Sequence, residues 1–97
     1  MLTVRQSPQA EADLYTILED LNQKNPLVAG RYAADFTEKG AMLAQFPEIG
    51  RARPEIATNL RSTLVYPYVM FYRIDETVLQ ILRILHGKQD LRRIMQE

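Results

Sequence analysis

The sequence contains no cysteine and only one histidine, His86. The absence of cysteine excludes disulfides, thiolate nucleophiles and cysteine-ligated zinc. A single histidine cannot build a histidine metal cluster. We therefore expect no metal and no cofactor.

Long hydrophobic runs are also missing. The longest apolar stretches, such as Val78 to Leu82 interrupted by Gln80, fall far short of the roughly twenty residues that a membrane-spanning helix needs. The first seven residues lack the apolar core of a signal peptide. These absences predict a cytoplasmic protein without a membrane-spanning segment.

Net charge is absent as well, because 12 basic residues balance 12 acidic ones. The two signs are unevenly distributed: residues 1–50 carry four basic and seven acidic side chains, and residues 51–97 carry eight and five. With 46% hydrophobic and 25% charged residues, the 97-residue chain is typical of one globular domain, spanning residues 1–97. Its surface should be polarised, which suits a macromolecular partner.

The first half of the chain predicts one strand and two helices. Residues Leu2–Gln6 alternate in a β-prone run, and Ser7-Pro8 then supplies an N-cap and a first helical position. Asn25-Pro26 repeats this start signal after a short break, and Phe46-Pro47 ends the second helix. Apolar residues recur at helical spacing in both segments: Ala10, Leu14, Ile17, Leu18 and Leu21, then Ala29, Tyr32, Ala33, Phe36, Gly40 and Leu43. The two helices should pack as an antiparallel hairpin.

The acidic residues of the first helix mostly lie off its apolar stripe. We interpret them as a solvated face, formed by Glu11, Asp13, Glu19 and Asp20.

The second half predicts three antiparallel strands after a loop. Residues 47–55 contain two prolines and a glycine, so we expect a loop that carries Arg51 and Arg53 into solvent. The β-prone runs that follow are 60–65, 68–74 and 77–85. The third run is apolar on both faces apart from Gln80 and Arg83, which is typical of a strand in the middle of a sheet.

The predicted fold class is therefore α+β: an N-terminal strand, an antiparallel two-helix hairpin and a three-stranded antiparallel meander. We expect the hairpin to cover one face of the sheet. A short C-terminal helical tail, residues 91–97, should partly cover the other face.

Three arginines, Arg61, Arg73 and Arg83, lie in the predicted strands. Strand alternation would place Arg83 on the same face as Leu79, Ile81 and Leu85. One interpretation is structural ion pairing with a carboxylate from Glu55, Asp75 or Asp90. The other is an anion-facing patch for RNA, DNA or an acidic protein segment. Further cations would extend that patch: Arg51, Arg53, Lys88, Arg92 and Arg93.

His86 and the nearby aromatic residues permit two interpretations each. His86 could act as a general acid or base, or could simply hydrogen-bond the end of its strand. The aromatic side chains could stack nucleic-acid bases, or could pack in the core. They are Tyr66, Tyr68, Phe71 and Tyr72.

Several fragments, in the order in which they occur, resemble the RelE/ParE toxin superfamily of bacterial toxin–antitoxin modules. They are Ser7-Pro8-Gln9-Ala10 with Asp13-Leu14, then residues 46–51, 60–62 and 68–73, and finally Ile81 to Asp90. The last fragment, which ends His86-Gly87-Lys88-Gln89-Asp90, resembles the ParE-like branch most closely. The resemblance covers almost the whole chain and implies the same fold.

The resemblance implies two alternative activities. ParE-like members inhibit DNA gyrase, whereas RelE-like members are ribosome-dependent mRNA endoribonucleases. RelE-like enzymes tend to have Gly-Lys-Arg where this chain has Gly87-Lys88-Gln89, an arginine near the position of Tyr68, and a tyrosine in the tail. Glutamine carries no charge to stabilise a phosphorane-like transition state. The differences favour a ParE-like inhibitor that binds gyrase and is not an enzyme.

The resemblance also implies a cognate antitoxin of the ParD/RelB type, which silences the toxin. The candidate partner-binding residues are Arg61, Arg73, Arg83, His86, Lys88, Arg92 and Arg93. If the protein is instead a ribosome-dependent nuclease, the candidate catalytic residues are His86, Arg83, Arg61 and Lys88. A third alternative is a copy that has lost toxicity and only binds the antitoxin.

Overall fold

The computed structural model describes residues 1–87. The predicted C-terminal helix and the candidate residues Lys88, Arg92 and Arg93 lie outside this part of the chain. The elements, in chain order, are β1 (Thr3–Gln6), α1 (Pro8–Lys24), α2 (Pro26–Gln45), β2 (Arg51–Ala52), β3 (Leu60–Val65), β4 (Tyr68–Asp75) and β5 (Val78–His86). The α+β prediction is confirmed.

Both helices begin where the sequence predicts. The Ser7 hydroxyl accepts a hydrogen bond from the Ala10 amide at 3.0 Å, and the Asn25 side chain accepts from the amides of the next helix. Each cap is followed by proline, whose missing N–H costs nothing in the first turn. Asn25 both ends α1 and starts α2, which makes the turn between the helices very short.

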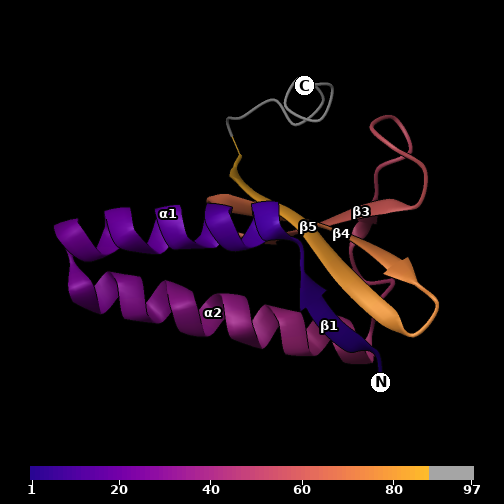
Figure 1. The fold of residues 1–97 in the computed structure, drawn as a ribbon, viewed down its shortest axis with the longest axis horizontal. Coiled ribbons are helices and arrows are strands. Elements are labelled where there is room, and N and C mark those ends of the chain that lie inside the picture. Colours follow the sequence, from indigo (N-terminus) through magenta and orange to yellow (C-terminus); the bar gives the residue numbers. More distant parts are fainter. Residues whose placement is uncertain (88–97) are drawn as a thin grey trace.

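The five strands form one sheet in the order β1-β5-β4-β3-β2 (Figure 1). The predicted meander is present as β3, β4 and β5, which pair antiparallel. β1 pairs parallel to β5, from Thr3 opposite Val78 to Gln6 opposite Ile81. β5 is thus an interior strand, as its apolar sequence predicts. The two-residue strand β2 is an addition within the predicted loop, where Arg51 pairs with Ser62.

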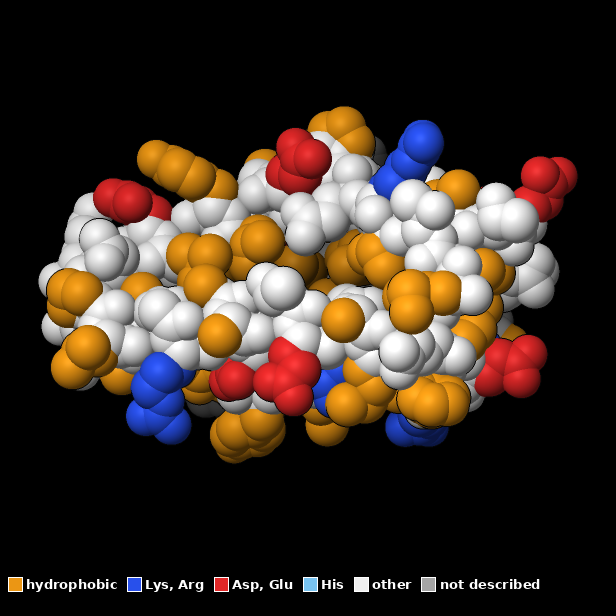
Figure 2. Space-filling model, turned by 90° about the horizontal axis from the view of Figure 1, so that it is seen from below, with side chains coloured by type: hydrophobic (Ala, Val, Ile, Leu, Met, Phe, Trp, Pro, Cys, Tyr) orange, Lys and Arg blue, Asp and Glu red, His pale blue; other side chains and the backbone are white. Residues whose placement is uncertain are grey.

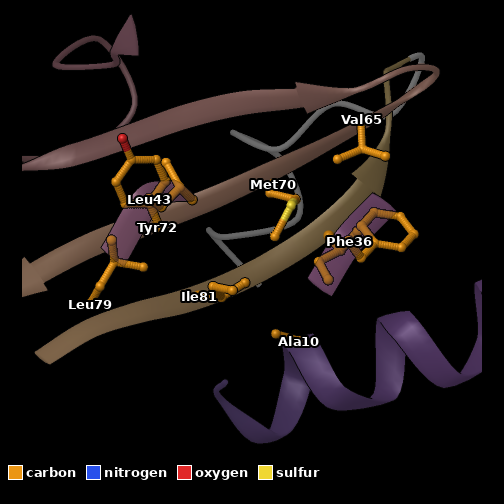
Figure 3. Packing of buried hydrophobic residues seen from close by; sticks show 9 residues of the cluster. Ala10, Phe36, Leu43, Val65, Met70, Tyr72, Leu79 and Ile81 are labelled. Atoms are coloured by element: carbon orange, nitrogen blue, oxygen red, sulfur yellow. The ribbon is translucent and has the colours of Figure 1, made fainter. Parts of the chain in front are cut away.

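The helical hairpin covers one face of the sheet and makes the main core with it. Phe36 and Leu43 of α2 point toward Met70, Tyr72 and the apolar residues of β5, and Ala10 of α1 packs near Ile81 (Figure 3). Tyr72, Leu43, Met70, Leu79, Ile81 and Ile84 are the largest side chains that this core buries completely. Viewed from the side of α2, the outer surface mixes charged and hydrophobic side chains (Figure 2).

A second, smaller cluster covers the opposite face of the sheet. Leu60, Phe71 and Leu85 are buried there, and Ile56 and Ala57 pack against them. Among the described residues, the cover for this face therefore includes the β2–β3 connection. The helical tail of residues 91–97, which was predicted to cover part of this face, lies outside the described residues.

β5 contains a bulge that changes which face its residues occupy. Tyr72 of β4 lies opposite Ile81 but the adjacent Phe71 lies opposite Arg83, so Leu82 is an extra residue. Leu79 and Ile81 belong to the helix-side core, whereas Leu85 belongs to the opposite cluster. The prediction that Arg83 shares one face with all three is wrong, because the inserted residue shifts the alternation after Ile81.

Candidate partner-binding surface

Arg83 is held by Asp13 of α1. The Arg83 Nε donates to Asp13 Oδ2 at 2.8 Å, and Nη2 donates to Oδ1 at 3.0 Å. The two side chains are only 23% and 15% exposed. This hydrogen bonding raises the pKa of the Arg83 guanidinium, so the group stays charged. The prediction that Asp13 belongs to a solvated helix face is therefore wrong. Its side chain turns inward to the edge of β5.

The start of α1 also satisfies the backbone around the bulge. β1 ends opposite Ile81, and beyond that point the Ser7 hydroxyl donates to the Leu82 carbonyl at 2.7 Å. The Ile84 amide donates to Asp13 Oδ2 at 3.0 Å. Ser7 and Asp13 thus take over from β1 as partners for this edge of β5, where unpaired backbone groups would otherwise be costly.

Arg61 lies on the helix-side face and holds the loop between α2 and β2. Its Nη1 donates to the carbonyls of Glu48, at 3.2 Å, and Gly50, at 2.8 Å. The buried Tyr72 hydroxyl accepts from the Gly50 amide at 3.0 Å and donates to the Pro47 carbonyl at 2.7 Å. Burial raises the pKa of the Tyr72 phenol, which keeps it protonated as a donor. Together these bonds fix the Pro47–Gly50 turn.

Arg73 lies on the opposite face, because it pairs with Leu60 in the sheet register while Arg61 pairs with Tyr72. Its Nε donates to Asp75 at 3.1 Å, and its side chain is 44% exposed. This is one of the ion pairs predicted from the sequence. The structure therefore separates Arg61 from Arg73 by the thickness of the sheet and places Arg83 at its edge.

Arg53 also lies on the Leu60 side of the sheet, and its side chain is 25% exposed. It pairs with Glu55 at 2.8 Å, donates to the Ser62 hydroxyl at 3.2 Å, and lies over the Phe71 ring at 5.8 Å. The Arg53 hydrogen bond is the main reason that the pKa of the Glu55 carboxyl is lowered. Of the two loop arginines predicted to lie in solvent, Arg53 is therefore partly buried and bonded within the protein, whereas Arg51 is exposed.

His86 ends β5 within a cluster of aromatic rings. It lies edge-on to Tyr68 at 5.8 Å between ring centroids, and Tyr68 in turn contacts Tyr32 at 5.5 Å and Phe36 at 5.8 Å. Burial raises the pKa of the Tyr68 phenol. Tyr68, like Tyr72, is a packing residue, while Tyr66 is 82% exposed.

Sequence reasoning predicted Ser7 as a helix cap but missed its bond to Leu82, and it missed the pairing of Asp13 with Arg83. The available signal was their place in the fragment Ser7-Pro8-Gln9-Ala10 with Asp13-Leu14, which carries part of the family resemblance. In the structure, Ser7 and Asp13 of that fragment form hydrogen bonds with backbone groups at the edge of β5. Within residues 1–87, no helix is long and apolar enough to cross a membrane.

Comparisons with known proteins identify the class to which this architecture belongs. Residues 4–91 match the family model described as the ParE toxin of type II toxin–antitoxin system, parDE. Toxin RelE2 of Caulobacter vibrioides is 36% identical over 79 residues, which are 81% of this chain and 88% of that protein. Toxin ParE3 of the same organism is 39% identical over 49 residues, covering 50% of this chain and 49% of that protein.

Solved structures give the same class. A structure of the chromosomal ParDE toxin–antitoxin system from P. aeruginosa superimposes with a TM-score of 0.74 at 26% identity, covering 89% of this chain and 96% of that one. The toxin–antitoxin complex RelBE2 from Mycobacterium tuberculosis gives 0.64 at 29% identity, covering 88% and 96%.

The fold and its relatives define a toxin of the RelE/ParE superfamily. More narrowly, the chain belongs to the ParE toxin family of type II toxin–antitoxin systems.

Proposed function

We propose that the protein acts as a ParE-like toxin, which inhibits DNA gyrase by binding and is neutralised by a cognate antitoxin of the ParD/RelB type. The observation that carries the choice is the environment of Tyr68. RelE-like nucleases, as the resemblance implies, have an arginine near this position. Here the position holds the ring of Tyr68, which packs against Tyr32, Phe36 and His86. A neutral phenol cannot neutralise the charge of a phosphate.

The family model and the neighbours support the same choice. The matching model is that of ParE toxins, and the ParDE structure superimposes better than the RelBE2 structure. The titles of both neighbours name a toxin–antitoxin system or complex, which supports an antitoxin as the partner of this chain. The polarised charge of the sequence suits such a protein partner.

The residues proposed to contact partners fall into two groups. Arg61 and Arg83 are only partly exposed and bond to the protein itself, so their contribution is to shape the surface around them, whereas Arg73, although paired with Asp75, is 44% exposed. Direct contact is assigned to the remaining candidates, which are Arg73, His86, Lys88, Arg92 and Arg93.

The second candidate function is a ribosome-dependent mRNA endoribonuclease. It is favoured by the 36% identity to Toxin RelE2 over most of that protein. Its catalytic set would be His86, Arg83, Arg61 and Lys88. The Arg83 guanidinium is bound by Asp13, and Arg61 by the loop carbonyls, so neither is directed to a phosphate. His86 and Lys88 would have to carry the chemistry.

The deciding experiment measures gyrase supercoiling and ribosome-dependent mRNA cleavage in parallel with the same purified protein. We expect inhibition of supercoiling that is retained in His86→Ala, which removes one contact among several, and that weakens several-fold in Lys88→Glu. Arg31→Glu, a charge reversal at an exposed position of α2, is the matched control and should inhibit like the parent. Messenger RNA cleavage that is lost in His86→Ala would establish the nuclease instead.

A further inference from the structure

The turn between α2 and β2 is held by a side chain from the core. Tyr72 of β4 is fully buried, and its hydroxyl points away from the rest of the core cluster (Figure 3). That hydroxyl donates to the Pro47 carbonyl at 2.7 Å and accepts from the Gly50 amide at 3.0 Å. Within the turn, the Ile49 amide donates to the Phe46 carbonyl at 3.2 Å. One buried phenol therefore fixes two backbone groups of a turn that also closes on itself.

Arg61 of β3 fixes the same turn from a second strand. Its Nη1 donates to the carbonyls of Glu48 and Gly50. With the bond from Tyr72 and the bond inside the turn, four of the five carbonyls of the Phe46–Gly50 turn accept a hydrogen bond from the protein. Loops are usually the more mobile parts of a protein. These bonds leave the Phe46–Gly50 turn little conformational freedom.

The same turn exposes two large apolar side chains. Phe46 is 58% exposed and Ile49 is 51% exposed. The start of the chain lies close by, because the Leu2 amide donates to the Ala44 carbonyl at 3.0 Å, and Met1 is 91% exposed. Apolar residues that are exposed singly are common on protein surfaces and need no explanation. Here two of them share one short and tightly bonded turn.

The hydrogen bonds of the turn do not serve to bury these two side chains. They satisfy the Tyr72 hydroxyl and the turn backbone, but they leave more than half of Phe46 and of Ile49 in solvent. Apolar side chains on a constrained backbone favour binding, because little conformational entropy is lost when a partner covers them. A few anchor residues of this kind commonly carry most of the binding energy of an interface.

We propose that Phe46 and Ile49 are apolar anchors that insert into a preformed pocket of DNA gyrase, and that Tyr72 and Arg61 are positioning residues that hold the turn for this contact. The proposal rests on the proposed function, which supplies gyrase as the target. It adds an apolar contact to the charged candidates and assigns Arg61 the surface that it shapes.

The chemistry of the turn fits a folded partner better than a flexible one. A segment that folds on binding lays its own apolar side chains into grooves of the protein that it covers. In the Phe46–Gly50 turn the toxin supplies the apolar side chains, already fixed in place, so the partner has to supply the pocket. A folded enzyme such as gyrase meets that requirement.

The test measures gyrase binding by calorimetry and inhibition of supercoiling with the same purified toxin. Phe46→Ala combined with Ile49→Ala should weaken binding at least tenfold and raise the half-inhibitory concentration by a similar factor. The urea midpoint should stay close to that of the parent, because both side chains are more than half exposed. Leu27→Ala is the matched control. It removes an apolar side chain that is 82% exposed at the start of α2, and it should bind like the parent.

A double-mutant cycle tests the positioning role of Tyr72. Tyr72→Phe keeps the ring in the core and removes the hydroxyl that bonds the turn. It should weaken gyrase binding several-fold when both anchors are present, and it should have no further effect when both are alanine. An equal effect in the two backgrounds would show that Tyr72 acts on the fold as a whole, which would overturn its positioning role.

The remaining outcomes separate the anchors from the proposed function. If the parent inhibits gyrase and the variant without anchors binds equally well, the anchor proposal is wrong and the proposed function stands. If the parent neither binds nor inhibits gyrase, the proposed function fails, and the partner assigned to the anchors fails with it. Loss of antitoxin binding with unchanged gyrase binding would make the turn an antitoxin contact and would also overturn the proposal.

Discussion

Asp13 and Arg83 lie 70 residues apart in the sequence and are joined by two hydrogen bonds, of 2.8 and 3.0 Å. The same carboxylate accepts the Ile84 amide. One side chain of α1 therefore neutralises a strand arginine and also completes the backbone bonding of β5. The ion pair connects the first helix to the last described strand at the point where β1 has ended.

Replacement of Asp13 by alanine should lower the free energy of unfolding by about 2–3 kcal/mol. Loss of one partner of a buried ion pair costs about 3–5 kcal/mol, and the residual exposure of this pair reduces that figure. Urea denaturation measures the change. Glu19→Ala, at an exposed position on the same helix, should stay within about 0.5 kcal/mol of the parent.

A double substitution measures the energetic coupling between Asp13 and Arg83. Asp13→Ala with Arg83→Met should cost less than the sum of the two single changes, because no unpaired charge remains. Strict additivity would contradict an energetic coupling between the two residues.

Gly50→Ala and Gly30→Ala should change stability in opposite directions. A Cβ at Gly50 would overlap the Tyr72 ring and hydroxyl, whereas a Cβ at Gly30 would meet nothing within 4 Å. Gly50→Ala should therefore cost about 1–3 kcal/mol through overpacking. Gly30→Ala, in a helix, should gain about 0.5–1 kcal/mol. Thermal unfolding of the two variants side by side tests the prediction, and a stabilised Gly50→Ala would refute the close packing at Tyr72.

The two helix caps should differ in their effect on stability. Ser7 is buried, accepts the Ala10 amide and donates to the Leu82 carbonyl, so Ser7→Ala should cost about 2 kcal/mol. The Asn25 side chain is exposed and, within residues 1–87, accepts hydrogen bonds from two amides of α2, so Asn25→Ala should cost about 1 kcal/mol. Chemical denaturation ranks them. An equal cost would mean that the bond from Ser7 to β5 contributes nothing.

Alkaline pH should destabilise the fold through Tyr72. Its pKa in the native state is raised above the ordinary value of 10.0, mainly by burial and against the opposing effect of the Gly50 hydrogen bond. Above about pH 10 the unfolded chain therefore releases a proton that the native state retains, and the free energy of unfolding falls as pH rises. Below that pH the two states hold the proton equally.

Urea midpoints measured between pH 8 and 11 test this dependence. The decline should be smaller in Tyr72→Phe, with a remainder from Tyr68, whose pKa is also raised by burial. Tyr15, which is 71% exposed, supplies the control, since Tyr15→Phe should keep the full decline of the parent. An unchanged slope in Tyr72→Phe would contradict the assignment.

The ends of the helices and strands could be read from the sequence because their signals are local. Pro8 and Pro26 mark the first turns of the helices, and each is preceded by a side chain that caps the amides of the helix it starts. The three strands of the meander occur within one residue of their predicted ends, since short turns interrupt the β-prone runs.

The faces of β5 and the partners of its side chains could not be read in the same way. A strand that is apolar on both faces gives no signal when Leu82 shifts the alternation. Asp13 resembles its exposed acidic neighbours on α1, and only the position of α1 beside the sheet edge brings it to Arg83. The candidate arginines were therefore predictable as strand residues, but their separation onto two faces and one edge was not.

The parallel pairing of β1 with β5 has a consequence for the order of synthesis. The ribosome makes Thr3–Gln6 at the start of the chain, but the strand that pairs with it, Val78–His86, emerges only after both helices and three other strands. The main core includes Leu79, Ile81 and Ile84 of that late strand, so it cannot close earlier. A nascent chain that stops before β5 has no closed core, and the domain gains its fold only after the ribosome has made this strand.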